Sequence, residues 1–69
     1  MTEEEKAVLR QIAETTKRIL DQQDRIAQMT AENQPTAASA DLLVALLDSM
    51  RAQQDRLELL RERVKLQKS

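Results

Sequence analysis

The sequence predicts an all-α fold in which two long antiparallel helices form a coiled-coil-like helical hairpin. Its 69 residues include no Gly and a single Pro, so only Pro35 interrupts helix-forming sequence. On both sides of Pro35, aliphatic residues recur at intervals of three and four, which is the spacing of one helix face. Acidic residues open the chain and basic residues close it, and an antiparallel hairpin sets these opposite charges side by side.

The first helix is predicted over residues 2–32, which contain no helix breaker. Thr2 followed by Glu5 has the spacing of a capping box, in which a hydroxyl and a carboxylate satisfy free amide groups of the first turn. Glu3 and Glu4 fall where the helix dipole favours anions. The first five residues therefore mark the start of this helix.

A narrow apolar stripe runs along this helix with a period of seven residues, as in a coiled coil. Its aliphatic members are Ile12, Ile19 and Ile26, preceded by Val8 or Leu9 and followed by Met29. The companion positions are polar: Thr15 and Gln22 in one register, Thr16 and Gln23 in the other. Both registers remain open at this stage.

The break between the helices is predicted at residues 33–38. Asn33 belongs to the few residue types that take the left-handed conformation after a helix, and Pro35 disfavours a helical residue before it. One continuous helix is disfavoured, because a Pro in a helix interior costs about 3 kcal/mol. The sequence therefore predicts two helices joined by a short turn, within a single domain of residues 1–69.

The second helix is predicted over residues 39–67, with Thr36 or Ser39 as its cap. Its core-facing positions are spaced three and four throughout: Leu43, Leu46, Met50, Gln53, Leu57, Leu60 and Val64. Its first turns carry an aliphatic belt from Leu42 to Leu47 that wraps most of the helix. Since one facing helix cannot cover the whole belt, a further surface is expected to bury it.

A five-residue word occurs in both helices, at residues 22–26 and again at residues 53–57. Each copy reads Gln-Gln-Asp-Arg followed by a large aliphatic residue, and each sets a Gln in or beside the seam. One interpretation is that two heptad helices built from few residue types share a short word. The other is that a buried polar layer selects one alignment of the helices.

The composition excludes most active-site chemistries. Without Cys or His there is no thiol nucleophile, no imidazole base and no zinc site, and without Gly there is no phosphate-binding loop. Two helices with polar outer faces offer no cleft that shifts the pKa of a carboxyl group. We therefore expect a chain that is not an enzyme and holds no cofactor or metal.

The charge and hydropathy patterns argue against nucleic acid or a membrane as the main partner. The net charge is −1, and the longest apolar run has six residues against the roughly 20 of a membrane span. The first residues lack the pattern of a signal peptide, so a cytoplasmic protein is expected. The charged residues are expected to form exposed i,i+3 and i,i+4 pairs such as Asp21 with Arg25.

Self-association is the expected mode of action, because a chain this short buries little surface on its own. Two hairpins pairing into a four-helix bundle, a homodimer, would cover the apolar stripes and the belt. A helix of another protein is the alternative occupant, which would make the chain an adaptor, co-chaperone or regulatory antagonist. The predicted oligomer or partner interface comprises Ile12, Ile19, Ile26, Leu42, Leu43, Leu46, Leu47, Met50, Leu57, Leu60 and Val64.

The plan of a short hairpin beginning Met1-Thr2, with Glu5-Lys6 and Leu9, is similar in outline to Rop-type plasmid RNA-binding hairpins. That resemblance implies an RNA-binding four-helix bundle as the alternative function. The family's RNA-contacting face is basic with an aromatic residue. Here the first helix carries the acidic residues Glu3 and Glu14, and the chain contains no Phe. By size and shape the chain also resembles the small hairpin co-chaperones of type III secretion systems.

Overall fold

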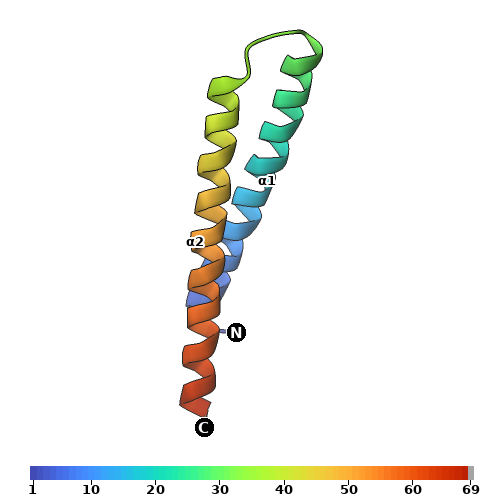
Figure 1. The fold of residues 1–69 in the computed structure, drawn as a ribbon. Helices are drawn as coiled ribbons and strands as arrows, with labels where there is room; N and C mark the ends of the chain where they lie inside the picture. Colours follow the sequence, from blue (N-terminus) through green and yellow to red (C-terminus); the bar gives the residue numbers. More distant parts are fainter. Residues whose placement is uncertain (69) are drawn as a thin grey trace.

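The computed structural model describes residues 1–68 and the side chains of residues 1–67. Helix α1 spans Glu3–Ala31 and helix α2 spans Ala37–Lys68, and the two contact each other along an antiparallel hairpin (Figure 1). The predicted fold class is therefore confirmed for one chain. The hairpin is narrow, with extents of 57 × 15 × 11 Å, and α2 runs on past the start of α1.

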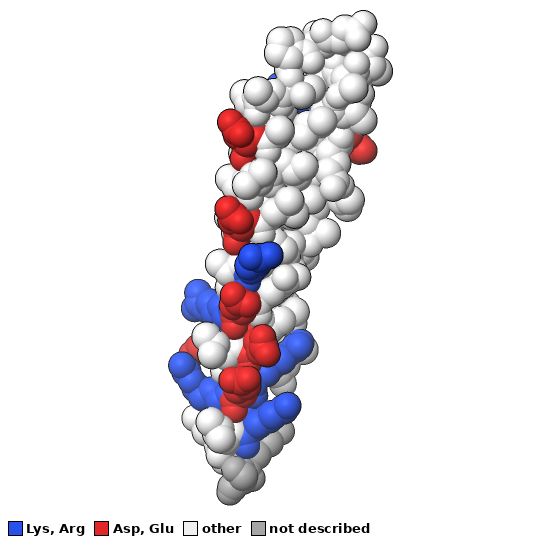
Figure 2. All heavy atoms as spheres, in the orientation of Figure 1, with Lys and Arg blue, Asp and Glu red and all other residues white. Residues whose placement is uncertain are grey.

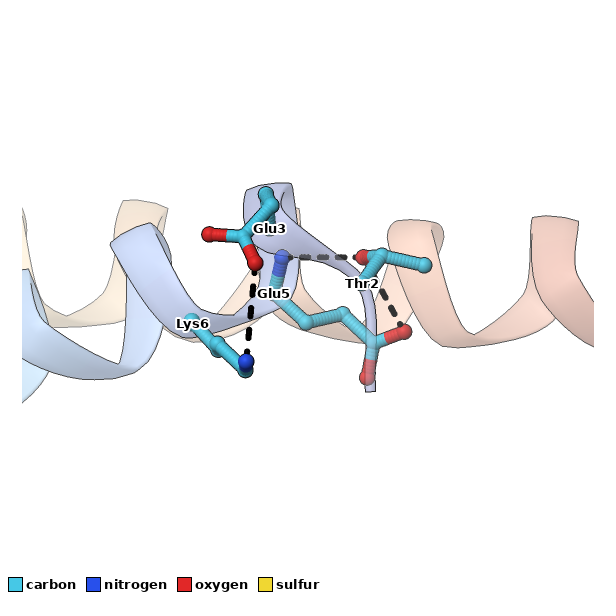
Figure 3. Close-up of polar contacts among 4 residues, drawn as sticks. All are labelled: Thr2, Glu3, Glu5 and Lys6. Atoms are coloured by element: carbon cyan, nitrogen blue, oxygen red, sulfur yellow. Dashed lines mark hydrogen bonds and ion pairs between the residues drawn. The ribbon is translucent and has the colours of Figure 1, made fainter.

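Helix α1 begins at the predicted cap. The Thr2 hydroxyl accepts a hydrogen bond of 3.1 Å from the main-chain amide of Glu5 and donates one of 3.3 Å to the Glu5 carboxylate (Figure 3). The amide half of the capping box is confirmed, while the carboxylate bonds to the cap hydroxyl. Lys6 lies beside Glu3 at 3.5 Å, so the first turn is held by side chains of the same turn.

Helix α1 ends in a Schellman motif centred on Asn33. This residue has φ of 59°, the left-handed conformation that its short polar side chain tolerates. The amides of Asn33 and Gln34 donate to the carbonyls of Thr30 at 3.1 Å and Met29 at 2.8 Å. These two bonds satisfy carbonyls that the end of a helix leaves without partners. The predicted role of Asn33 is confirmed.

Helix α2 begins two residues earlier than predicted. Thr36 rather than Ser39 stands at its start, because the Thr36 carbonyl accepts the first helical bond from Ala40 at 2.8 Å. Pro35 precedes it and lies outside both helices. The Ser39 hydroxyl instead donates to the Met29 sulfur at 3.4 Å, which ties α2 to the last turn of α1.

The two helices meet along one seam with residues spaced three and four on each side. The seam residues of α1 are Glu5, Val8, Ile12, Thr15, Ile19, Gln22, Ile26 and Met29. Those of α2, from its flanking Thr36 onward, are Thr36, Ser39, Leu43, Leu46, Met50, Gln53, Leu57, Leu60 and Val64. All of these are buried or half-buried in the hairpin. Of the two registers open for α1, the structure has the one with Thr15 and Gln22 inside.

Val8 is the most deeply buried side chain, with 2% of its surface exposed. It forms the core cluster with Leu57 and Leu60 of α2, and Leu9 and Ile12 pack against that cluster. Between the two candidates for the start of the stripe, Val8 takes the seam position and Leu9 flanks it. The contacts of Val8 set the register in which the two helices pass each other.

Candidate interaction surfaces

Most residues of the predicted interface lie inside the hairpin. Leu42 and Leu47 are the exceptions, with 51% and 48% of their surfaces exposed. The remaining members belong to the seam: Ile12, Ile19, Ile26, Leu43, Leu46, Met50, Leu57, Leu60 and Val64. The seam thus accounts for these nine within one chain, and the surfaces left for a partner are those that flank the seam.

Polar side chains interrupt the seam at several levels. Glu5, Thr15 and Gln22 are each more than nine-tenths buried. Gln22 Nε2 donates to the Ser39 main-chain oxygen at 2.9 Å, so its amide is satisfied by the facing helix. Gln53 Oε1 is buried and has no hydrogen-bond partner among the described residues. The two seam glutamines of the repeated word therefore differ in how well they are satisfied.

One side of the seam carries charged residues beside two hollows. The first hollow, of about 390 Å³, is lined by Arg18, Asp21, Gln22, Arg25, Leu42 and Leu46. The second, of about 190 Å³ near the chain ends, is lined by Thr2, Glu4, Leu60, Arg63, Val64 and Gln67. Glu4, Arg18 and Arg25 fall on one heptad position, which places both hollows on the same side. We call this side the arginine face.

The opposite side of the seam is apolar and free of charge over a long stretch. We call this the uncharged face and define it by Leu9, Ala13, Thr16, Leu20, Gln23, Ala27 and Thr30 of α1 with Ala37, Ala40, Val44 and Leu47 of α2. All are exposed except the half-buried Leu9. Leu20 and Val44 are the most open of the large members, at 56% and 57%.

The threonines of the uncharged face turn their hydroxyl groups inward. Thr16 Oγ1 donates to the Ile12 carbonyl and Thr30 Oγ1 to the Ile26 carbonyl, each at 2.8 Å. Because these hydroxyls are satisfied within α1, the threonines present mainly their methyl groups at the surface. Gln23 is then the one α1 member of this face whose polar group has no partner within the described residues.

Val44 belongs to the belt from Leu42 to Leu47 that a further surface was expected to bury, whereas Leu20 was not predicted to lie at an interaction surface. The signal was present, because residues 9, 13, 16, 20, 23, 27 and 30 form a second series with intervals of three and four. A seam on the other side of the isoleucines would have used part of the same series. Only the register of the hairpin decides which series is buried and which stays exposed.

The charged residues are unevenly distributed along the hairpin. Figure 2 shows them gathered over the half that holds the chain ends, with few toward the turn. Residues 21–45 carry one basic and four acidic side chains, a net charge of −3. The rest of the chain carries ten basic and eight acidic side chains, a net charge of +2. Each hairpin is therefore electrostatically polar along its length.

Few of these charges are paired. In the region whose side chains are described, the one ion pair is Lys6 with Glu3, between exposed groups. The exposed pairs expected along each helix, such as Asp21 with Arg25, do not close to within 4 Å. The acidic start and basic end do run side by side, as Glu4 and Arg63 line one hollow without an ion pair. The Lys68 side chain, expected to join them, lies outside the described residues.

Comparison with known proteins gives no match: no protein-family model, no curated protein and no solved structure matches the chain. Among the described residues, no three acidic side chains gather as a metal site would require. Neither α1 nor α2 has a stretch that is both long and apolar enough to cross a membrane. The uncharged face and the arginine face are thus the features on which a function can be argued.

Proposed function

We propose that this chain is a non-catalytic helical hairpin of the cytoplasm that acts by forming a homodimer and by binding another protein, as an adaptor, co-chaperone or regulatory antagonist. The uncharged face carries this proposal. It exposes three large aliphatic side chains, Leu20, Val44 and Leu47, on a surface to which α1 contributes only uncharged residues between Leu9 and Thr30. A contiguous exposed apolar surface of this kind is typical of a protein interface.

The energetics favour covering this face. Burying a Leu or Val side chain fully contributes about 1.5–3 kcal/mol, and each of these three is about half exposed. A symmetric pair of hairpins covers six such side chains at once, together with the alanines between them. That gain acts against the loss of translational and rotational freedom on association. The seam alone contributes little free energy of folding beyond what one hairpin needs, because several of its levels are polar.

The arginine face supports contact with a second protein. Arg18 and Arg25 line a hollow together with the aliphatic side chains of Leu42 and Leu46, and neither guanidinium has an ion-pair partner among the described residues. An acidic amphipathic helix with one aliphatic anchor matches this chemistry, because carboxylates pair well with guanidinium groups. Asp21 in the same hollow, and the absence of any aromatic residue, do not favour RNA as the ligand.

A matched pair of lysine variants tests self-association. Leu47→Lys places a charge on the uncharged face, whereas Ala45→Lys adds the same charge at an exposed position off that face. We expect Leu47→Lys to dissociate at concentrations where the wild type and Ala45→Lys remain dimeric, as measured by sedimentation velocity. Equal behaviour of the two variants, or a monomeric wild type at high concentration, would contradict the proposal.

A further inference from the structure

We infer that the second copy binds in the antiparallel direction, with α1 packed against α1 about a twofold axis at Leu20. This inference rests on the proposed self-association and adds its geometry. A twofold dimer is self-complementary: if a residue of one copy contacts a second residue in the other copy, the reverse contact is also made. Two arrangements bring the uncharged faces together. The parallel one sets α1 over α2 of the second copy, and the antiparallel one sets α1 over α1.

The uncharged stripe of α1 is symmetric about Leu20. Ala13 and Ala27 lie seven residues to either side of it, and Thr16 and Gln23 lie four and three residues away. In an antiparallel pair, Leu20 therefore meets Leu20 of the second copy, and each Ala13 meets an Ala27. Small side chains on both sides of the central leucine let the two helices approach closely. In the parallel arrangement α1 faces α2, so the symmetry of the α1 stripe does not match it to its partner.

Helix α2 has its exposed aliphatic residues at the same level. Val8 packs with Leu57 and Leu60, and in an antiparallel seam these two contacts set Leu20 level with residues 45–48. Val44 directly precedes this range and Leu47 lies within it. A twofold axis through Leu20 therefore also brings Val44 and Leu47 of one copy close to those of the other.

The charge distribution selects the same direction. An antiparallel pair sets the turn half of one copy, with a net charge of −3, against the half with +2 of the other. In this register Arg51 comes within about one helical turn of the level of Asp41 of the second copy. A parallel pair sets −3 beside −3 and +2 beside +2 along the whole contact. Both the apolar and the charged residues thus favour the antiparallel arrangement.

A charge-complementation experiment tests the twofold axis. Leu20→Lys and Leu20→Glu each place two like charges against one another across the axis, so each should raise the dimer dissociation constant by about tenfold or more. An equimolar mixture should return the dissociation constant to within about threefold of the wild-type value. Lys17→Glu mixed with wild type serves as the control, since that position lies off the uncharged face. Failure of the mixture to recover would overturn the Leu20 contact.

Spin labels measure the direction independently of any change at the axis. The chain has no Cys, so Gln34→Cys in the turn and Lys17→Cys on α1 each provide one label per copy. With a helical rise of 1.5 Å per residue, the antiparallel dimer separates the two turn labels by about 40 Å along the dimer axis and the Lys17 labels by about 9 Å. Turn labels as close as the Lys17 labels would overturn the inference and leave self-association standing. A monomer by light scattering would overturn both.

Discussion

The side-chain amide of Gln22 donates a hydrogen bond of 2.9 Å to the main-chain oxygen of Ser39, across the seam between the two helices. Gln22 is buried, and this bond links α1 to the first turns of α2 near the turn of the hairpin. Gln53, at the matching place in the repeated word, has a buried side-chain oxygen without a partner in the described part of the chain. Gln22 is thus hydrogen-bonded across the seam, whereas the buried Gln53 oxygen has lost its hydrogen bonds to water without gaining another.

We expect Gln53→Leu to raise the free energy of unfolding by about 1–2 kcal/mol, because it removes a buried polar atom that lacks a hydrogen bond. Gln22→Leu should gain less, since it also removes a bond that is made. Urea titrations followed by far-ultraviolet circular dichroism measure both changes. If Gln53→Leu were the less stable of the two, the assignment of Gln53 as an unsatisfied seam residue would be wrong.

We expect Ile19→Asp to unfold the hairpin or reduce its helicity sharply, because it sets an unpaired charge in a seam position that is 9% exposed. Its neighbour Leu20 is 56% exposed and provides the control. Leu20→Asp should weaken association while helicity recovers at high protein concentration. Circular dichroism over a concentration series separates the two effects. An Ile19→Asp variant with unchanged helicity would refute the seam register.

We expect Asn33→Ala to destabilise the hairpin by about 1 kcal/mol, because Ala tolerates the left-handed backbone poorly. Asn33→Gly should be neutral or slightly stabilising, since Gly adopts positive φ without steric cost. Thermal melts of the three proteins give the ranking. A Gly variant less stable than the Ala variant would show that the asparagine side chain, and not its backbone conformation, matters at the turn.

We expect Arg18→Ala to change the free energy of unfolding by no more than about 0.5 kcal/mol, because Arg18 has no ion-pair partner among the described residues. The same substitution should reduce binding of an acidic amphipathic helix to the arginine face. Chemical denaturation checks the first expectation. A large loss of stability would mean that Arg18 supports the fold and not a partner.

The seam of α2 could be predicted from the sequence because a single series of mostly aliphatic residues follows the intervals of three and four. In α1 the isoleucines fix only every seventh position, and polar residues fill the companion positions in either register. Thr15 and Gln22 could not be distinguished from Thr16 and Gln23 by periodicity alone. The structure resolves this choice, because Val8 rather than Leu9 packs against Leu57 and Leu60.

The interaction surfaces were harder to predict than the fold. The belt of Leu42 to Leu47 was expected to act as one surface, yet Leu42 lies on the arginine face and Leu47 on the uncharged face. Which side an exposed leucine faces depends on the register of both helices, which a pattern in one helix does not contain. Leu20 was missed for the same reason, since its stripe is recognisable only once the seam is assigned.

Coverage of the uncharged face by a second copy of the chain requires a dimer in solution. Size-exclusion chromatography over a dilution series, combined with light scattering, measures this, with refractive-index detection because a chain without aromatic residues absorbs little at 280 nm. We expect a molar mass twice the 7.9 kDa of one chain, falling toward the single-chain value only at high dilution. A stable, fully helical monomer at every concentration would contradict the claim.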